Sequence, residues 1–173
     1  MPSSQRSRIT AATDFVYGRM RHADAWSSAT ADPLPPERGF DSLRGDKYCL
    51  LTTFRKSGEP VPTPVWFGLA DGKVYFRTEA AVGKVKRIRN NPRVRVAPCT
   101  LRGRPLGPPA QGRARVLGPD EAERAERAIA ANYGLFRRIY EAIGQRLSSI
   151  DQVYIEIAPL SPADVVSSSA AQQ

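Results

Sequence analysis

The sequence predicts one mainly β domain, a small barrel of six antiparallel strands with flanking helices. Three observations predict this fold. Short apolar, β-prone runs recur along the chain, and several alternate with period 2. Most connections between the runs are short enough for hairpins. The predicted order, β-β-β-α-β-β-α-α-β, lacks the regular strand–helix alternation of a parallel sheet.

The first three strands are predicted to form a meander. Residues 48–54 are a short apolar run, and a loop with a turn glycine leads to a return strand at 61–69. Because Pro62 and Pro64 cannot donate to a ladder, this strand is expected to be an edge strand or to be bulged at its start. An Asp-Gly turn then leads to a third strand at 73–78.

The hydrophobic period changes after the third strand. Val82, Val85 and Ile88 recur every three positions, which predicts a short amphipathic helix over 82–90 that ends near Pro92. The later elements are expected in this order: a strand at 93–99, a loop at 100–109, a strand at 111–117, helices at about 119–133 and 135–147 separated at Gly134, and a closing strand at 151–157.

The two ends of the chain differ in composition from its centre. Residues 1–38 are rich in Ser, Thr, Ala, Arg and Pro, and residues 160–173 show no hydrophobic period. We therefore expect a weakly structured extension at 1–38, a barrel domain at 39–159 and a disordered tail at 160–173. No apolar run is long enough to span a membrane and no apolar leader is present, so a cytoplasmic protein is expected.

Positive charge is concentrated in one part of the chain. The sequence has a formal net charge of +9, and residues 80–119 contain ten Lys or Arg and no Asp or Glu. A one-signed stretch of this length is typical of a segment that meets an anion. The candidates are nucleic acid, a phosphorylated small molecule and solvent.

Residue types that carry acid–base or metal chemistry are scarce. The only histidine, His22, lies in the N-terminal extension, and no Cys/Asp/Glu cluster accompanies it. No metal is therefore expected, a Ser-His-Asp hydrolase is excluded, and a bound organic cofactor is expected to carry any chemistry. Cys49 and Cys99 lie in apolar runs and are expected to be buried, reduced thiols, although their spacing is compatible with a disulfide.

The helix at 82–90 is the first candidate binding site. It opens at Gly83, where unpaired N–H groups and the positive end of the helix dipole favour an anion. Lys84 and Arg87 lie three residues apart, on one side of the helix. The pattern is compatible with a phosphate-binding segment and with an ordinary solvated basic face.

Two other motifs carry weaker signals. Thr63 and Trp66 lie on the proline-interrupted strand, where a bulge would expose backbone and an aromatic ring to a planar ligand, although Trp66 is also a typical core residue. The string Arg102-Gly-Arg-Pro105 matches the core of an AT-hook. Because it occurs once, between two predicted strands, nucleic-acid binding is not the favoured interpretation.

Three strings together resemble a known family. They are residues 51–67 (LTTFRKSGEPVPTPVWF), 83–92 (GKVKRIRNNP) and 96–104 (VAPCTLRGR). Their order and spacing are similar to those of the pyridoxamine-phosphate-oxidase-like, deazaflavin-dependent oxidoreductases of actinobacteria, over about 40–157. The resemblance implies a split β-barrel of the FMN-binding type, assembled as a homodimer with two cofactor sites at the subunit interface.

The resemblance also implies which residues bind the cofactor. Lys84 and Arg87 would hold the anionic part of coenzyme F420, a deazaflavin with a phosphodiester and an oligoglutamate tail. The strand around 63–66 would line its ring or ribityl region, the segment 78–84 would cradle it, and two loop arginines would close over its tail. The implied cofactor-binding residues are Thr63, Pro64, Val65, Trp66, Thr78, Val82, Gly83, Lys84, Arg87, Arg102 and Arg104. The sequence departs from the family pattern at Val82, where a small hydroxyl residue is expected, and at Thr100, where an acid is expected.

The leading hypothesis is a homodimeric oxidoreductase that uses reduced F420 to transfer a hydride to a small organic acceptor. The alternatives are an FMN-dependent oxidase or reductase of the same fold, a non-catalytic F420-binding protein and an AT-hook-like DNA-binding protein. No residue is assigned a catalytic role, and Tyr133 is the nearest candidate for a proton donor.

Overall fold

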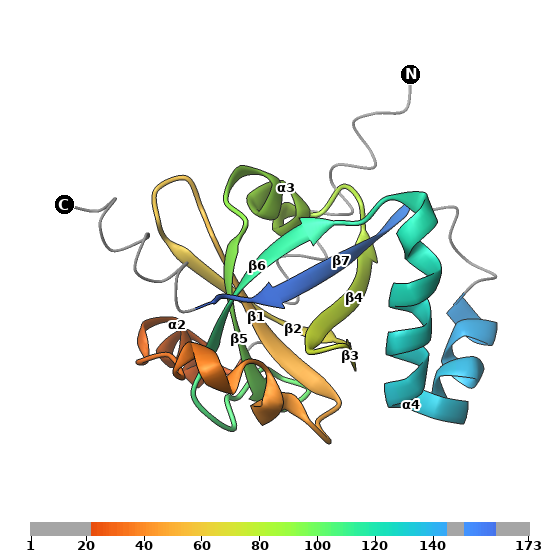
Figure 1. The fold of residues 1–173 in the computed structure, drawn as a ribbon, viewed down its shortest axis with the longest axis horizontal. Helices are drawn as coiled ribbons and strands as arrows, with labels where there is room; N and C mark the ends of the chain where they lie inside the picture. Colours follow the sequence, from red (N-terminus) through yellow and green to blue (C-terminus); the bar gives the residue numbers. More distant parts are fainter. Residues whose placement is uncertain (1–21, 145–150, 162–173) are drawn as a thin grey trace.

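The computed structural model describes residues 22–144 and 151–161. They form one sheet of seven strands in the order β2-β1-β5-β6-β7-β4-β3, and every neighbouring pair is antiparallel. The sheet curls into a half-barrel with helices at its rims (Figure 1). The predicted fold, an antiparallel split barrel with flanking helices, is confirmed, but the predicted count of six strands is wrong.

Most strands begin and end close to the predicted residues. They are β1 Tyr48–Phe54, β2 Pro60–Trp66, β3 Gly68–Ala70, β4 Lys73–Glu79, β5 Arg93–Cys99, β6 Ala110–Val116 and β7 Gln152–Pro159. The helices, with η for a 3₁₀-helix, are η1 Ala23–Trp26, α2 Ser27–Thr30, η2 Pro36–Arg38, η3 Asp41–Leu43, α3 Gly83–Asn90, η4 Pro119–Glu121 and α4 Ala122–Gly144. Helix α3 lies at one end of the curled sheet, α2 lies near the other end, and α4 stands beside β3 and β4 (Figure 1).

Strand β2 lies at one edge of the sheet, as its prolines predicted. Within the described strands it pairs with β1 alone. Pro60, Pro62 and Pro64 occupy alternate positions, so their missing N–H groups all fall on one side of the strand. An edge strand accommodates them because one of its sides has no neighbouring strand.

The seventh strand arises because the predicted strand at 61–69 breaks at Phe67. The residues on either side of the break belong to opposite edges of the sheet, since β2 pairs with β1 and β3 pairs with β4. Phe67 satisfies its backbone through α4 instead of a ladder. Its N–H donates to Tyr133 Oη at 3.1 Å, and its carbonyl oxygen accepts from Asn132 Nδ2 at 2.9 Å.

The glycine that follows Phe67 lets α4 approach the sheet closely. A Cβ added to Gly68 would lie 2.2 Å from the carbonyl carbon and oxygen of Ala128. Ala125, Ala128 and Ile129 form a buried cluster here with Tyr75 of β4. A glycine at this corner is therefore a packing requirement.

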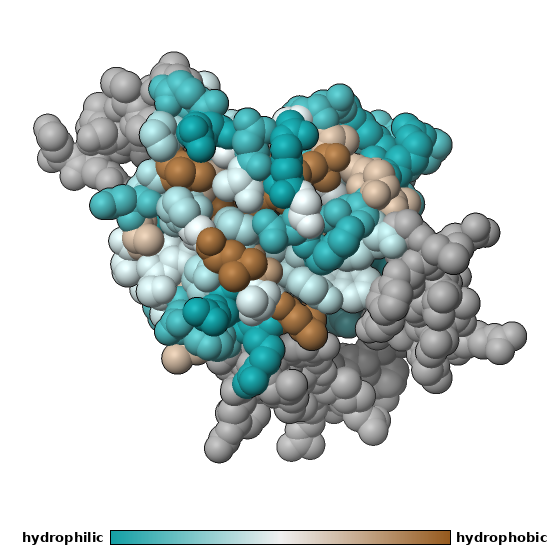
Figure 2. Space-filling view, turned by 90° about the horizontal axis from the view of Figure 1, so that it is seen from below, coloured by the Kyte–Doolittle hydropathy of each residue, from teal (hydrophilic) through white to brown (hydrophobic). Residues whose placement is uncertain are grey.

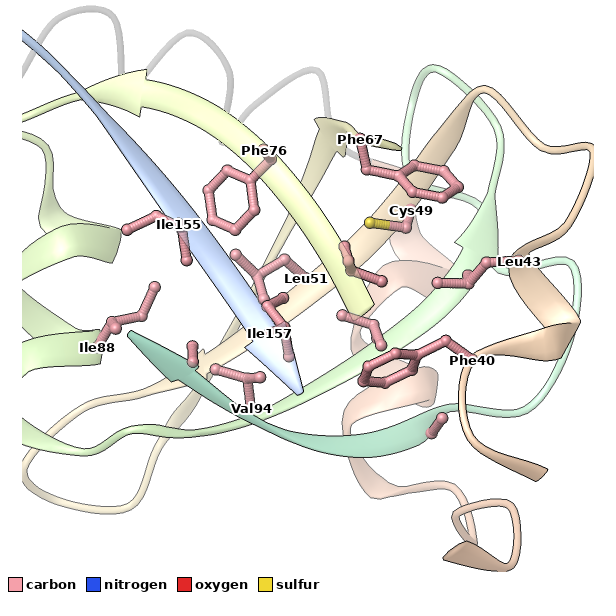
Figure 3. Close-up of a cluster of buried hydrophobic side chains, with 14 residues drawn as sticks. Phe40, Leu43, Cys49, Leu51, Phe67, Phe76, Ile88, Val94, Ile155 and Ile157 are labelled. Carbon is pink, nitrogen blue, oxygen red and sulfur yellow. The ribbon is translucent and has the colours of Figure 1, made fainter. Parts of the chain in front are cut away.

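The main apolar core lies inside the curl of the sheet, where side chains from most elements point toward one another (Figure 3). Strands β4 and β7 supply Phe76, Ile155 and Ile157, and α3 supplies Ile88. The other labelled members are Phe40, Leu43, Cys49, Leu51, Phe67 and Val94. The core therefore ties α3 to the strands on which the site is built.

The segment before the predicted domain is more ordered than its composition suggested. Residues 22–38 form η1, α2 and η2, and Ala25 is fully buried. The guanidinium of Arg95 on β5 donates to the carbonyl oxygens of Ala29 at 2.8 Å and Ala31 at 2.9 Å. These hydrogen bonds attach the segment to the sheet, although its sequence lacks a hydrophobic period.

Helix α4 is continuous where the sequence predicted two helices. Gly134 stays within one helix over Ala122–Gly144. An internal glycine costs only about 1 kcal/mol relative to alanine, so it does not end a helix by itself. Residues 145–147 of the predicted second helix, residues 1–21 of the predicted extension and residues 162–173 of the predicted tail lie outside the described residues. No described helix is both long and apolar enough to cross a membrane.

A buried carboxylate ties the start of α4 to the sheet. Glu156 on β7 is 5% exposed. It accepts hydrogen bonds from Tyr75 Oη at 3.0 Å, Arg115 Nε at 2.9 Å and Lys73 Nζ at 3.2 Å. Arg115 also bonds Glu121 of η4 at 2.6 Å. Burial raises the pKa of Glu156, but the three donors hold it below its ordinary value, and Arg115 lowers the pKa of Glu121 to about 2.

Replacing Gly68 by alanine should destabilise the fold by about 1–3 kcal/mol or more, because the new methyl group overlaps the Ala128 backbone. Urea unfolding followed by circular dichroism measures this. Gly118→Ala is the matched control, since its Cβ would meet only the movable Asp120 carboxylate, and it should cost less than about 1 kcal/mol. Equal stability of the two variants would contradict the packing requirement at the corner.

Glu156→Gln should lower the free energy of unfolding at pH 7 by about 1–3 kcal/mol, because Arg115 and Lys73 lose a buried partner. Because the folded pKa values of Glu156 and Glu121 are depressed, their stabilisation is present above the unfolded pKa of about 4.3 and is lost as the pH falls toward about 2. Wild type should therefore lose more stability than the variant between pH 7 and pH 3.

Glu59→Gln, which breaks the exposed pair with Arg55, is the control for this experiment. It should leave both the stability at pH 7 and its acid dependence close to wild type. A wild type and a Glu156→Gln variant with parallel pH dependence would contradict the role given to the buried carboxylate.

Candidate functional site

A basic groove lies between α3 and the hairpin that joins β1 to β2. Its volume is about 790 Å³. Its lining residues are Phe54, Arg55, Lys56 and Ser57 from the hairpin, and Gly83, Lys86, Arg87, Asn90 and Asn91 from α3 and the residue after it. Four of these residues are basic and none is acidic, so the groove favours an anionic ligand.

Helix α3 turns one face to the core and another to the basic groove. Val85 and Ile88 are buried against the sheet. Gly83 and Arg87, four residues apart, share the groove face. The N-cap residue, Val82, makes no side-chain capping bond, so no side chain covers the first N–H groups at the positive end of the helix dipole.

Two threonines on separate strands of the sheet bond the predicted phosphate-binding side chains. Lys84 Nζ donates to Thr78 Oγ1 of β4 at 3.4 Å, and Arg87 Nε donates to Thr53 Oγ1 of β1 at 2.7 Å. Thr53 is 1% exposed, so its bond fixes the guanidinium from the buried side. Of the predicted set, Gly83 and Arg87 therefore line the basic groove, whereas Lys84 bonds Thr78 of β4 and is not among the lining residues.

Two of the four basic side chains at the groove have no acidic partner among the described residues. Arg55 pairs with Glu59 at 3.1 Å, but both side chains are exposed, so this pair is weak. Lys56 and Lys86 form no ion pair with any residue of the described ranges. The attraction of an anionic ligand to these bases would therefore exceed the competition from acidic side chains.

The predicted residues of β2 are divided between two faces of the strand. Val65 packs against the main core, and Thr63, two residues away, shares its face. Pro64 and Trp66 lie on the opposite face, because side chains alternate along a strand. The side chains of these four residues therefore cannot line one pocket within a single subunit.

Trp66 is held in an aromatic stack. Its ring lies over Tyr133, with centroids 4.9 Å apart and an interplanar angle of 18°, and meets Tyr48 edge-on at 6.1 Å. The Tyr133 hydroxyl accepts from the Phe67 N–H and donates to the Lys47 carbonyl oxygen. Burial raises the pKa of Tyr133 well above its ordinary value. This geometry supports a structural role for Tyr133 rather than the role of proton donor.

The two loop arginines lie at the other end of β1 from the basic groove. Thr100 closes their turn, because its N–H donates to the Arg104 carbonyl at 3.0 Å and its Oγ1 accepts from the Arg104 N–H at 3.2 Å. Gly103, with a φ of +81°, is buried against Pro64 between the exposed Arg102 and Arg104. A closed turn of this kind differs from the extended segment that an AT-hook inserts into a minor groove.

Both cysteines are free, buried thiols, as the sequence indicated. Cys49 belongs to the main core, whereas Cys99 packs with Leu50 and Ala97 in a separate cluster. Burial raises the pKa of both thiols, that of Cys99 to about 12. Neither is a candidate nucleophile, because the reactive form is the thiolate.

Sequence reasoning missed part of the site. Thr53, Arg55, Lys56 and Asn91 lie within the strings that resemble the known family, but none of them was predicted to bind the cofactor. The adjacent bases at the β1–β2 turn were the available signal. They lie about 30 positions from α3 in the sequence, and only the pairing of strands brings them to it.

Residues 37–160 match the family model described as pyridoxamine 5'-phosphate oxidase. Similar solved structures include a conserved hypothetical protein from Mycobacterium tuberculosis (18% identity, 82% of this chain, 86% of that chain, TM-score 0.51). Another is a FAD-binding protein from Mesorhizobium loti (16% identity, 74% of this chain, 91% of that chain, TM-score 0.50). A third is the heme storage protein HutZ from Vibrio cholerae (17% identity, 75% of this chain, 92% of that chain, TM-score 0.51). At these identities the likeness shows the fold alone. No curated protein was found to match.

Tyr133→Phe should remove the two hydroxyl hydrogen bonds of the corner while keeping the aromatic stack, and should cost about 1–3 kcal/mol. The near-ultraviolet circular dichroism of the stacked Trp66 should also change. The matched control is Tyr154→Phe, which removes one hydroxyl hydrogen bond to Glu126 and leaves both hydrogen bonds of the Phe67 backbone in place. An unchanged near-ultraviolet spectrum with full stability would contradict the role given to Tyr133.

Proposed function

The chain belongs to the pyridoxamine 5'-phosphate oxidase family, and we propose that it is an oxidoreductase that uses reduced coenzyme F420 to deliver a hydride to a small organic acceptor. One observation supports the proposal above the others. The basic groove runs along α3 from its uncapped start, with Arg87 held in place from below by Thr53. An elongated, phosphate-bearing cofactor suits such a groove.

The residues present fit the anionic part of this cofactor. Arg87, on the groove face of α3, carries a planar fork of donors that suits a phosphodiester, and Lys84, bonded to Thr78, adds positive charge near the start of the helix. Gly83 has no side chain, so a ligand can approach the backbone N–H groups at the helix start. When bound, reduced deazaflavin supplies the hydride, and the protein supplies orientation and exclusion of water.

We also propose that the active form is a homodimer with cofactor sites at the subunit interface. The predicted residues of β2 face two ways, and Arg102 and Arg104 lie away from the basic groove, which supports an arrangement in which two subunits contribute to each site. Apolar patches interrupt the hydrophilic surface (Figure 2). The exposed large apolar side chains of the described residues are Trp26, Leu101 and Leu106.

FMN is the second candidate cofactor, because a FAD-binding protein from Mesorhizobium loti shares the fold. FMN carries one phosphate and no acidic tail, so it would need only the start of α3. The groove continues along the helix to Asn91, which favours a longer anion. A cytoplasmic location is part of the proposal and is supported by the two free thiols.

The alternative to an enzyme is a protein that stores a cofactor without catalysis. A heme storage protein from Vibrio cholerae also shares the fold. Steady-state oxidation of reduced F420 with a panel of small acceptors separates the two functions. Turnover with any acceptor supports an oxidoreductase, and binding of F420 without turnover across the panel supports storage.

Titration with F420, followed by the fluorescence of the cofactor, tests the proposed ligand. Wild type should bind at micromolar concentrations, and Lys84→Gln/Arg87→Gln should bind at least tenfold more weakly, because charge-assisted hydrogen bonds are lost. Arg44→Gln, an exposed residue paired with Asp41, is the matched control and should bind like wild type. Binding of FMN in place of F420 would transfer the proposal to FMN, and binding of neither would contradict it.

A further inference from the structure

Strands β5 and β6 place two arginines directly opposite each other. Arg93 and Arg113 are partners in the antiparallel register, and both side chains are exposed. Like charges at directly opposed positions destabilise a sheet. The two guanidinium groups therefore repel each other on the outer face of these strands.

The neighbouring arginines of the same strands are treated differently. Arg95, two residues along β5, is bound by the carbonyl oxygens of Ala29 and Ala31. Arg115, two residues along β6, is paired with two carboxylates. In contrast, Arg93 and Arg113 form no ion pair and no side-chain hydrogen bond with any residue in 22–144 or 151–161.

The arginine pair adjoins the far end of the basic groove. Asn91 lines the groove, and its Oδ1 accepts from the backbone N–H of Arg93 at 3.1 Å. The carbonyl oxygen of Pro92 accepts from the N–H of Ala114, beside Arg113, at 2.7 Å. Two short links thus join the end of α3 to the starting turn of β5 and to β6.

Positive charge therefore continues past the groove. Lys56 and Lys86 lie within it, and Arg93 and Arg113 lie beyond its end, all without an acidic partner in the described part of the chain. The start of α3 and the arginine pair lie near opposite ends of the helix, about 12 Å apart for eight residues at about 1.5 Å each. A compact anion can reach only one of them, whereas an extended one can reach both.

We propose that Arg93 and Arg113 form a second anion subsite, and that the groove and this subsite together bind an extended polyanionic small molecule along α3. The chemical class is a chain of phosphate groups or a comparable linear polyanion. Each guanidinium offers a bidentate fork, and an anion between the two relieves their repulsion. The inference goes beyond the proposed function, because it holds whichever ring system the protein binds.

Isothermal titration calorimetry with sodium triphosphate and with orthophosphate, at fixed ionic strength, tests the subsite. Wild type should bind triphosphate more tightly than orthophosphate. Arg93→Gln/Arg113→Gln should bind triphosphate at least tenfold more weakly and orthophosphate with unchanged affinity, because orthophosphate binds at the start of α3. Arg38→Gln/Arg44→Gln removes the same two charges from exposed positions elsewhere and should keep wild-type affinity for both anions.

The stability of the variants without ligand gives a second, independent readout. Arg93→Gln/Arg113→Gln should unfold at the wild-type temperature or a few degrees above it, because a like-charge pair is removed. An equal loss of triphosphate affinity in the two double variants would overturn the proposal, and so would unchanged triphosphate affinity in Arg93→Gln/Arg113→Gln or no triphosphate binding by wild type. The F420 titration tests the proposed function separately, so the subsite and the proposed function can each fail independently of the other.

Discussion

The fold depends on one corner, where Phe67 joins the two edges of the sheet. Strands β2 and β3 are adjacent in sequence yet lie at opposite ends of the strand order, so the sheet must curl for this residue to connect them. Asn132 and Tyr133 of α4 satisfy the backbone of Phe67, and Gly68 lets the helix come close enough to do so. The curl in turn encloses the core that holds α3 against the strands.

Two of the ten bases in the basic stretch that stands out in the sequence serve the fold. Arg95 binds the N-terminal segment to β5, and Arg115 joins β7 to the start of α4. Four of the other bases lie on α3, where Lys86 and Arg87 line a groove without acids, whereas Arg102 and Arg104 lie at the other end of β1. An acid-free run of sequence thus separates in space into a structural part and a part available to an anion.

The sequence predicted the helices and strands better than the tertiary contacts between them. Period-2 runs and prolines located the strands and the edge, and the three-residue period located α3. The break at Phe67 was not predictable, because its cause is a pair of side chains about 65 positions away on α4. Likewise Lys84 and Arg87 were foreseeable from the helix start, whereas Thr53 and Lys56 reach them only through strand pairing.

In the proposed function, the anionic part of the cofactor binds along α3. Backbone amide NMR during titration of the protein with F420 tests it most directly, because every residue of the site carries its own signal except the prolines. We expect the largest shifts at Gly83 to Arg87 and at Arg55 to Ser57, on the two walls of the basic groove. Shifts confined to the turn around Arg102 and Arg104, with none along α3, would contradict it.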